Sequence, residues 1–314
     1  MRHLLNLDAL TAGEFADILA VATYLKNRRA KGLVEHVFTG KTLAMVFEKP
    51  SLRTRLSFEI AMTELGGKAI YIRGEEVGID VREPVQDVAR VLGRYAHGIM
   101  ARVFRHKTVA GLAQHAGVPV INGLCDLHHP CQALGDFLTL QEHLGRIDGL
   151  KIVFIGDGNN VARSLAHACV LAGSKFVLAC PKAYAFTAED QTAFGAAWGT
   201  TISQVHDPKE AVAGADVLYS DVWTSMGQEA EKVQRLHDFQ GYQINDALIA
   251  QGAPSARIMH CLPAHRDEEI TDGAVEHPRS IIFDQAENRL HAQKAVLRLL
   301  LANDAPAVIA AARA

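Results

Sequence analysis

The sequence lacks three features, and each absence excludes a class of protein. No run of apolar residues approaches the ~20 residues that a membrane-spanning helix requires, so we expect no membrane partner. Neither sign of charge dominates, since 32 basic and 35 acidic residues give a net charge of −3, and this argues against a nucleic-acid partner, which would require a basic surface. Cysteines are few, and their odd number, five in a chain of 314 residues, argues against a framework of disulfides. We therefore expect reduced thiols in a cytoplasmic protein.

What the sequence does contain is a regular alternation of strand-like and helix-like segments. With 49% apolar residues, the chain can form two domains with a core each. The expected strands are Thr42–Phe47, Lys68–Ile72, Gly98–Val103, Val118–Ile121, Lys151–Ile155, Lys175–Ala179, Thr201–Val205, Asp216–Ser220 and Arg257–Cys261. Because they are apolar on both faces, helices should cover both sides of parallel sheets. The pattern predicts an α/β fold of two doubly wound domains, each with a central parallel sheet, linked by helices.

The boundary between the domains is predicted near residues 145–149. A helical pattern ends at Gly145, and Asp148-Gly149 precedes the next expected strand. The first domain is therefore expected to span residues 1–146 and the second residues 147–286. Residues from about 287 to 314 have the pattern of one long helix, which we assign to the first domain.

The first expected strand is followed by a turn rich in anion-binding groups, Ser51-Leu52-Arg53-Thr54-Arg55. Ser51 is a natural N-cap, and the backbone N–H groups of the first helical turn are unpaired donors. The alternative is a capped helix whose arginines only face solvent. Two guanidinium groups and a hydroxyl at the end of a buried strand favour a phosphate-binding site.

Further polar residues follow other strands of the first half. Arg102 lies near the end of the third expected strand, while His129 and Gln132 lie where the last helix of the domain begins. An alternative is a zinc site formed by Cys125, Cys131 and the neighbouring histidines. Their spacing matches no structural zinc pattern, so we expect no metal.

In the second half, the segment Gly156–Val161 begins like a dinucleotide-binding fingerprint. Val161 replaces the third glycine, and the next expected strand ends without an acidic residue for a ribose. We therefore expect no nicotinamide cofactor, although a dehydrogenase remains an alternative. Asn160 is instead expected to bind a small polar ligand.

Asp221 and Cys261 come at the ends of two other expected strands. Asp221 could simply cap a turn, and Cys261 could be a small buried apolar side chain. Covalent thiol catalysis is a further alternative for Cys261. Neighbouring residues on a strand point to opposite faces, so His260 is poorly placed as its base.

Taken in order along the chain, these motifs resemble those of the aspartate/ornithine carbamoyltransferase family, and its ornithine branch most closely. The resemblance spans nearly the whole chain. The segments that carry it are Ser51–Arg55, His129–Gln132, Asp221–Gln228, His260–Pro263 and Ala286–Arg289. The Ser-Met-Gly and His-Cys-Leu-Pro motifs within them are typical of the ornithine branch.

The resemblance implies that the protein transfers the carbamoyl group of carbamoyl phosphate to the side-chain amine of L-ornithine, giving L-citrulline and phosphate. It implies a homotrimer or a multiple of trimers, and neither a metal nor an organic cofactor. Carbamoyl phosphate would be bound by Ser51, Leu52, Arg53, Thr54, Arg102, His129, Gln132, Cys261, Leu262 and Arg289. Ornithine would be bound by Asn160, Asp221, Ser225 and Met226. In one departure from the family pattern, Gly78 stands where many relatives have a glutamine that reaches a neighbouring subunit.

The implied chemistry explains these residue types. An alkylamine has a pKa near 10 and must lose a proton before it attacks, which Asp221 and Cys261 can assist. Arg102, His129 and Thr54 would stabilise the oxyanion that forms on the carbonyl group. Two alternatives remain: a carbamoyltransferase for another amine, such as putrescine or N-acylated ornithine, and a non-catalytic protein that binds a phosphorylated metabolite.

Overall fold

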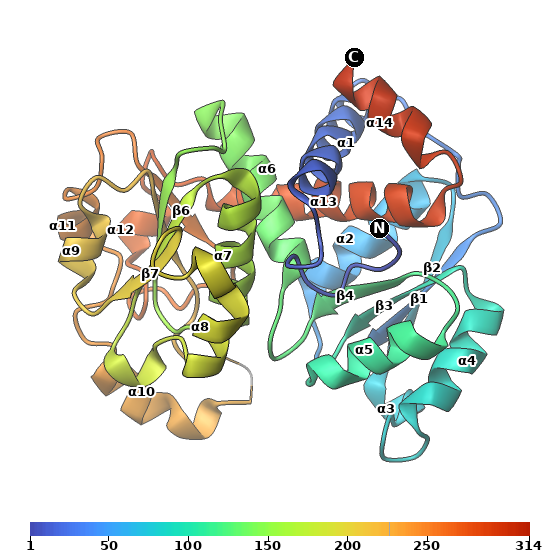
Figure 1. Cartoon of the computed structure of the whole chain (residues 1–314), viewed down its shortest axis with the longest axis horizontal. Coiled ribbons are helices and arrows are strands. Elements are labelled where there is room, and N and C mark those ends of the chain that lie inside the picture. The colour runs from blue at the N-terminus through green and yellow to red at the C-terminus, as the bar shows by residue number, and fades with distance from the viewer. Residues whose placement is uncertain (226) are drawn as a thin grey trace. The chain divides into compact units, whose positions relative to one another are not determined.

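The computed structural model describes residues 1–225 and 227–314. These residues form two compact units, one of Met1–Leu138 with Glu287–Ala314 and the other of Thr139–Ala286 (Figure 1). The first unit has a four-stranded sheet and the second a five-stranded sheet, and all neighbouring strands are parallel. The α/β fold class predicted from the sequence is thereby confirmed.

The sheet of the first unit has the order β2-β1-β3-β4. Its strands are β1 (Thr42–Phe47), β2 (Lys68–Arg73), β3 (Gly98–Arg102) and β4 (Val120–Leu124). The register sets Phe47 beside both Arg73 and Arg102, so three strands finish at the same edge. The chain leaves β1 in one direction towards β2 and later returns to build β3 and β4 on the other side. This order creates a switch point between β1 and β3, where ligands bind in open α/β sheets.

Helices cover this sheet because β1, β3 and β4 are buried in both alternating sets of residues. The helices of the first unit are α1 (Ala12–Ala30), α2 (Leu52–Glu64), α3 (Gly74–Val77), α4 (Val85–Tyr95), α5 (His106–His115) and α14 (Ala305–Arg313). On one face, Val88 of α4 and Leu112 of α5 belong to the same core cluster as Val46. Gly93 of α4 permits close packing here, because a Cβ atom would lie 1.8 Å from the carbonyl oxygen of Ala116. Two further helices, α6 (Pro130–Leu144) and α13 (Ile282–Leu301), run from one unit into the other.

The edge strand β2 departs from the predicted burial. The expectation that all strands are apolar on both faces is wrong for β2, whose Ile70 side chain is 54% exposed and whose Lys68 and Arg73 are also exposed. The reason is its position, because β2 lies at the edge of the sheet and pairs only with β1. Charged residues are common on such edge strands.

The tail also differs from the prediction of one long helix over residues 287–314. It forms two helices, since α13 ends at Leu301 and α14 begins at Ala305. Pro306 in the first turn of α14 cannot continue a preceding helix, because it lacks an N–H group and disfavours helical backbone in the residue before it. The turn is held by Arg298, whose Nη2 donates to Asp304 Oδ2 at 2.9 Å. The second helix then packs beside α1 (Figure 1).

The sheet of the second unit has the order β7-β6-β5-β8-β9. Its strands are β5 (Lys151–Ile155), β6 (Lys175–Ala179), β7 (Ile202–Val205), β8 (Val217–Ser220) and β9 (Arg257–His260). Its helices are α7 (Asn160–Ala172), α8 (Ala188–Phe194), α9 (Pro208–Val212), α10 (Lys232–Asp238), α11 (Asp246–Ile249) and α12 (Asp272–Val275), with short turns η1 (Lys182–Tyr184), η2 (Gly195–Ala197) and η3 (Glu229–Glu231). The switch point lies between β5 and β8.

Both faces of this second sheet are packed. Val153 and Leu218 belong to one core cluster together with Val212 of α9. From the opposite face of β5, Phe154 stacks on Tyr219 with ring centres 5.3 Å apart. This alternation is what a strand covered on both sides requires. Among the residues that the structure describes, no helix has the length and apolar character needed to cross a membrane.

Candidate active site

The turn that begins α2 has the geometry of an anion-binding site. Ser51 caps the helix, since its Oγ accepts a hydrogen bond from Thr54 N at 3.3 Å and lies 3.1 Å from Thr54 Oγ1. Leu52 and Arg53 occupy the first turn, where the backbone N–H groups have no partner within the helix and the positive end of the helix dipole lies. The structure thus places these four predicted residues together where β1 ends.

A buried hydrogen-bond network joins three predicted residues, Thr54, Gln132 and Arg289. Arg289 of α13 donates from Nη1 to Gln132 Oε1 at 2.7 Å and from Nη2 to Thr54 Oγ1 at 3.2 Å. Gln132 in turn donates from Nε2 to Asp136 Oδ1 at 2.8 Å. All four side chains are almost fully buried. Such a network fixes rotamers before any ligand arrives, because leaving a member unpaired would be costly.

His129 lies directly before α6 in a strongly positive environment. Burial lowers the pKa of His129 well below its usual value, and the charges of Arg289 and Arg102 lower it further. The imidazole is therefore neutral at pH 7 and can offer a hydrogen bond without adding charge. Burial and the charge of Arg102 also lower the pKa of Lys49. The arginines, the lysine and the helix N-terminus together favour an anion.

Sequence reasoning missed three supporting residues of this region: Lys49, Asp136 and Gln293. Asp136 orients Gln132, as described above. With its amide oxygen turned towards Arg289, Gln293 accepts hydrogen bonds from Nη2 at 2.8 Å and from Nε at 3.1 Å. Asp136 and Gln293 each follow their partner by four residues on a helix, so the spacing alone could have identified both.

In the second unit, Asp221 and Cys261 form the acid–thiol pair. Asp221 directly follows β8 and Cys261 directly follows β9, two neighbouring strands. The Cys261 thiol donates to Asp221 Oδ1 at 2.8 Å. Asp221 also accepts from Val222 N at 2.8 Å and, at Oδ2, from Asn159 Nδ2 at 2.9 Å. Cys261 is only partly buried, so this pair can face a ligand.

Asn159 is a residue that sequence reasoning missed. Its Oδ1 accepts from Val161 N at 2.9 Å and Ala162 N at 3.1 Å and so caps α7, while its Nδ2 holds Asp221. An asparagine directly before a helical pattern is the standard N-cap signal and could have revealed it. The predicted ligand residue Asn160 is the first residue of α7 and is partly exposed.

The segment after Cys261 is held in an unusual conformation. Leu262 has a φ of 55°, which costs a residue other than glycine ~1–2 kcal/mol. Its N–H donates to His260 Nδ1 at 2.9 Å, so the ring proton of His260 is on Nε2, which lies 3.0 Å from Glu269 Oε1. Both ring nitrogens are thus engaged. The expectation that His260 is not the base for Cys261 agrees with this geometry.

The remaining predicted ornithine residues lie after β8. Ser225 is partly buried, and its N–H donates to Gln228 Oε1 at 3.0 Å. Met226 lies outside the described residues. Gly227 has a φ of 94°, a conformation that glycine adopts without strain.

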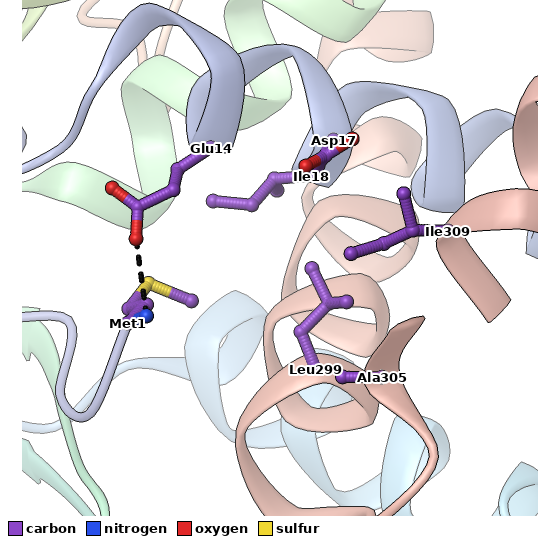
Figure 2. Close-up of a pocket in the computed structure, with 7 residues that line it drawn as sticks. All are labelled: Met1, Glu14, Asp17, Ile18, Leu299, Ala305 and Ile309. Atoms are coloured by element: carbon purple, nitrogen blue, oxygen red, sulfur yellow. Dashed lines mark ion pairs between the residues drawn. The ribbon is translucent and has the colours of Figure 1, made fainter. Parts of the chain in front are cut away.

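Two other features of the described residues lie away from these positions. The one group of side chains close enough to share a metal ion is His265, Glu268 and Glu269, so it contains none of the cysteines of the alternative zinc site. A hollow of about 140 Å³ in the first unit is lined by Met1, Glu14, Asp17, Ile18, Leu299, Ala305 and Ile309, with the Met1 ammonium group 3.0 Å from Glu14 (Figure 2). No predicted site residue lines this hollow.

The candidate residues of the two units differ in chemistry. The first presents positive groups and a neutral imidazole, which can bind an oxyanion and polarise a carbonyl group. The second presents a carboxylate and a thiol, which can bind an amine and accept its proton.

Known proteins match the chain over both units. Residues 2–142 match the family model described as aspartate/ornithine carbamoyltransferase, carbamoyl-P binding domain, and residues 148–300 match its Asp/Orn binding domain. An ornithine carbamoyltransferase of Thermus thermophilus is 51% identical over 300 residues, which is 96% of this chain and 97% of the relative. One of Archaeoglobus fulgidus is 49% identical over 304 residues, which is 97% of this chain and 99% of the relative.

A solved structure agrees in fold. The ornithine carbamoyltransferase of Pyrococcus furiosus superposes with a TM-score of 0.91 at 48% identity, covering 96% of this chain and 97% of that one. The resemblance seen in the motifs is confirmed by these matches over nearly the full length. The chain therefore belongs to the aspartate/ornithine carbamoyltransferase family.

Proposed function

We propose that the protein is an ornithine carbamoyltransferase, which transfers the carbamoyl group of carbamoyl phosphate to the side-chain amine of L-ornithine and releases L-citrulline and phosphate. The observation that carries this proposal is the hydrogen bond of 2.8 Å between the Cys261 thiol and Asp221. Two further findings support the proposal. The helix α2 begins with an arginine-rich turn, and relatives at about 49% identity are ornithine carbamoyltransferases.

The first unit binds carbamoyl phosphate in this proposal. The N–H groups of the first turn of α2, the Ser51 hydroxyl and the guanidinium groups of Arg53 and Arg102 would hold the phosphate. Thr54, Gln132 and His129 would surround the carbamoyl group, which the contacts of Thr54 and Gln132 with Arg289 support. We assign residues 1–146 and the C-terminal helices to this role.

The second predicted domain, residues 147–286, binds ornithine in this proposal. Asn160, Ser225 and Met226 would bind the amino acid, and Asp221 would bind its amine. A carboxylate suits a substrate that arrives as a cation, and it can then accept the proton that the amine must lose. The thiol of Cys261 shares Asp221 Oδ1 and so limits the positions that the amine can take.

The reaction requires the two ligands to meet. The neutral amine nitrogen attacks the carbamoyl carbon, a C–N bond forms, and the carbonyl oxygen becomes an oxyanion. Arg102, His129 and Thr54 would stabilise this charge, and one such donor commonly contributes ~3 kcal/mol to the transition state. The C–O bond to phosphate then breaks, and the amine proton passes to Asp221 or to the departing phosphate. The family resemblance also assigns Cys261 and the backbone of Leu262 to carbamoyl phosphate binding.

The proposal includes a homotrimer, or a multiple of trimers, in the cytoplasm. An unpartnered apolar surface on the first unit supports the association of subunits, because Leu52, Leu56 and Ile60 of α2 and Ile70 of the edge strand β2 are all exposed. The five free cysteines fit a reducing compartment.

A direct assay tests the proposed function. The full-length protein is supplied with carbamoyl phosphate and, separately, with ornithine, putrescine or N-acetylornithine, and both phosphate and carbamoylated amine are measured. We expect phosphate and citrulline in equal amounts with ornithine, and much slower reaction with the other amines. Turnover of putrescine or N-acetylornithine at a comparable rate would contradict the substrate assignment, and no amine-dependent phosphate release would contradict the enzyme assignment.

A further inference from the structure

The guanidinium group of Arg235 connects three separate segments of the second unit. Arg235 lies on α10 and is only 6% exposed. Its Nη1 donates to Asp157 Oδ2 at 2.7 Å and to the carbonyl oxygen of Trp223 at 2.9 Å. Its Nε donates to Glu231 Oε2 at 2.9 Å, and its guanidinium carbon lies 4.8 Å from the centre of the Tyr184 ring. None of these contacts involves a residue to which a role has been assigned so far.

Two of the partners flank the segment that carries Ser225. Trp223 lies before this segment and Glu231 lies after it. The Arg235 side chain therefore holds the chain on both sides of the segment. The Trp223 ring is itself fixed, because it stacks on Phe239 at 5.4 Å with an interplanar angle of 13°. The position of Ser225 is thereby tied to α10.

The third partner connects the same guanidinium group to Asp221. Asp157 lies in the turn after β5, and its carbonyl oxygen accepts a hydrogen bond from Asn159 N at 2.7 Å. Asn159 Nδ2 in turn donates to Asp221 Oδ2 at 2.9 Å. Two residues, Asp157 and Asn159, therefore connect Arg235 to the carboxylate of the acid–thiol pair through an unbroken series of hydrogen bonds.

The ion pair between Arg235 and Asp157 is not a surface contact that could be lost at little cost. Burial raises the pKa of Asp157, and its hydrogen bond to Arg235 opposes this effect. A buried carboxylate without its cation is strongly unfavourable. After loss of Arg235, the Asp157 carboxylate would therefore take up a proton, or the turn that carries it would move. Either change would reach Asn159 and, through it, Asp221.

We propose that Arg235 is a positioning residue for the amino-acid substrate: by binding Asp157, Trp223 and Glu231 at once, it sets the separation between Asp221 and the segment that carries Ser225. This inference rests on the proposed function, because it assigns these two residues to one ligand. The planar fork of arginine is required, since a lysine ammonium group is a point charge that does not bind three fixed acceptors in the same directions.

Kinetics of Arg235→Gln and Arg235→Lys test the inference. For Arg235→Gln we expect the KM for ornithine to rise by about tenfold or more, while the KM for carbamoyl phosphate changes by less than about threefold. Inhibition by L-norvaline, which has the carbon chain of ornithine but no side-chain amine, should weaken in parallel. Arg235→Lys should restore most of the thermal stability but not the ornithine KM. Equal rises in both KM values, or an ornithine KM fully restored by lysine, would overturn the inference.

A milder pair of variants covers the case in which Arg235→Gln does not fold. Glu231 and Glu276 are both 58% exposed, and each pairs with an arginine, at 2.9 Å and 2.7 Å. Glu231→Gln should raise the ornithine KM by about two- to threefold, as expected for a partly exposed pair, whereas the matched control Glu276→Gln should leave it unchanged. An identical ornithine KM in both variants would count against the inference. Failure of the proposed function is distinguishable, because the unsubstituted protein would then form no citrulline.

Discussion

In the first unit, Thr54, Gln132 and Arg289 stand on long helices and bind one another through buried side chains, whereas in the second unit Asp221 and Cys261 stand on loops that leave the ends of strands. Arg289, Gln132 and Thr54 already form a hydrogen-bonded network, so the proposed carbamoyl phosphate site is built before a ligand arrives. Asp221 and Cys261 depend on turns that are held from outside, by Asn159 and by the His260–Glu269 pair. The comparison indicates a rigid anion site and an amine site whose geometry depends on more distant residues. Substitutions in the two units should therefore have different kinetic signatures.

The largest effect is expected from Asp221→Asn in the second unit. The amide keeps the shape of the side chain but loses the negative charge and the capacity to accept a proton. We expect kcat/KM for ornithine to fall by about 10³-fold, with little change in the KM for carbamoyl phosphate. Steady-state kinetics with each substrate varied in turn measure this. Asp246→Asn, at an exposed position of the same unit, is the control and should behave as the unsubstituted protein.

Arg102→Gln in the first unit should have the next largest effect. Loss of one oxyanion donor is expected to lower kcat by about 100-fold, and the KM for carbamoyl phosphate should also rise. Arg105→Gln removes an exposed arginine three residues further along the chain and should be nearly silent. If both arginine variants lose activity equally, general loss of positive charge rather than a placed donor would explain the result.

The low pKa of His129 predicts a pH dependence of stability that belongs to the first unit. The folded protein holds His129 neutral, so the unfolded chain takes up the proton first as the pH falls below about 6.5. The stabilisation from neutral His129 is present above that pH and is lost below it, at up to ~1.4 kcal/mol per pH unit. Thermal unfolding at about pH 7.5 and about pH 5.5 should show a smaller acid destabilisation for His129→Gln. An unchanged difference between the two pH values would contradict the assignment.

The smallest effect concerns the reactivity of the thiols. Burial raises the pKa of Cys131 in the first unit, and of Cys180 in the second, to about 12, and both side chains are fully buried. Cys261 is partly exposed. Brief treatment with iodoacetamide followed by peptide mass spectrometry should therefore modify Cys261 first, and ornithine with phosphate should protect it. Modification of Cys131 at the same rate would show that the core of the first unit opens readily.

The sequence was sufficient for the fold because the strands carry strong local signals. Thr42–Phe47 and Lys151–Ile155 are β-branched and apolar, and they are strands over the predicted residues. Prediction failed for β2 and for the C-terminal tail for two different reasons. The exposure of β2 follows from its place at the sheet edge, which no local pattern reveals, whereas Pro306 in the tail was a visible signal that helical periodicity outweighed.

The candidate site divides in a similar way. Ser51, Arg102, Asp221 and Cys261 could be predicted because chemistry-bearing residues at strand ends stand out in a sequence. Arg235 could not be, because its proposed role depends on three partners, one of which, Asp157, lies 78 residues away from it along the chain. Gln293 and Asn159 lie between these cases, since helical spacing and capping rules would have identified them.

The second unit is one uninterrupted stretch, Thr139–Ala286, inserted into a first unit that is assembled from both ends of the chain. Under the proposed function, the residues assigned to the acceptor all lie in this single block of sequence, whereas those assigned to the donor come mainly from the two blocks of the first unit. A change of acceptor would then need substitutions in that single block only, provided that Cys261, Leu262 and the portions of α6 and α13 at its two borders are retained. The donor half has no such freedom, because Arg289 from one block must match Gln132 and Thr54 from the other.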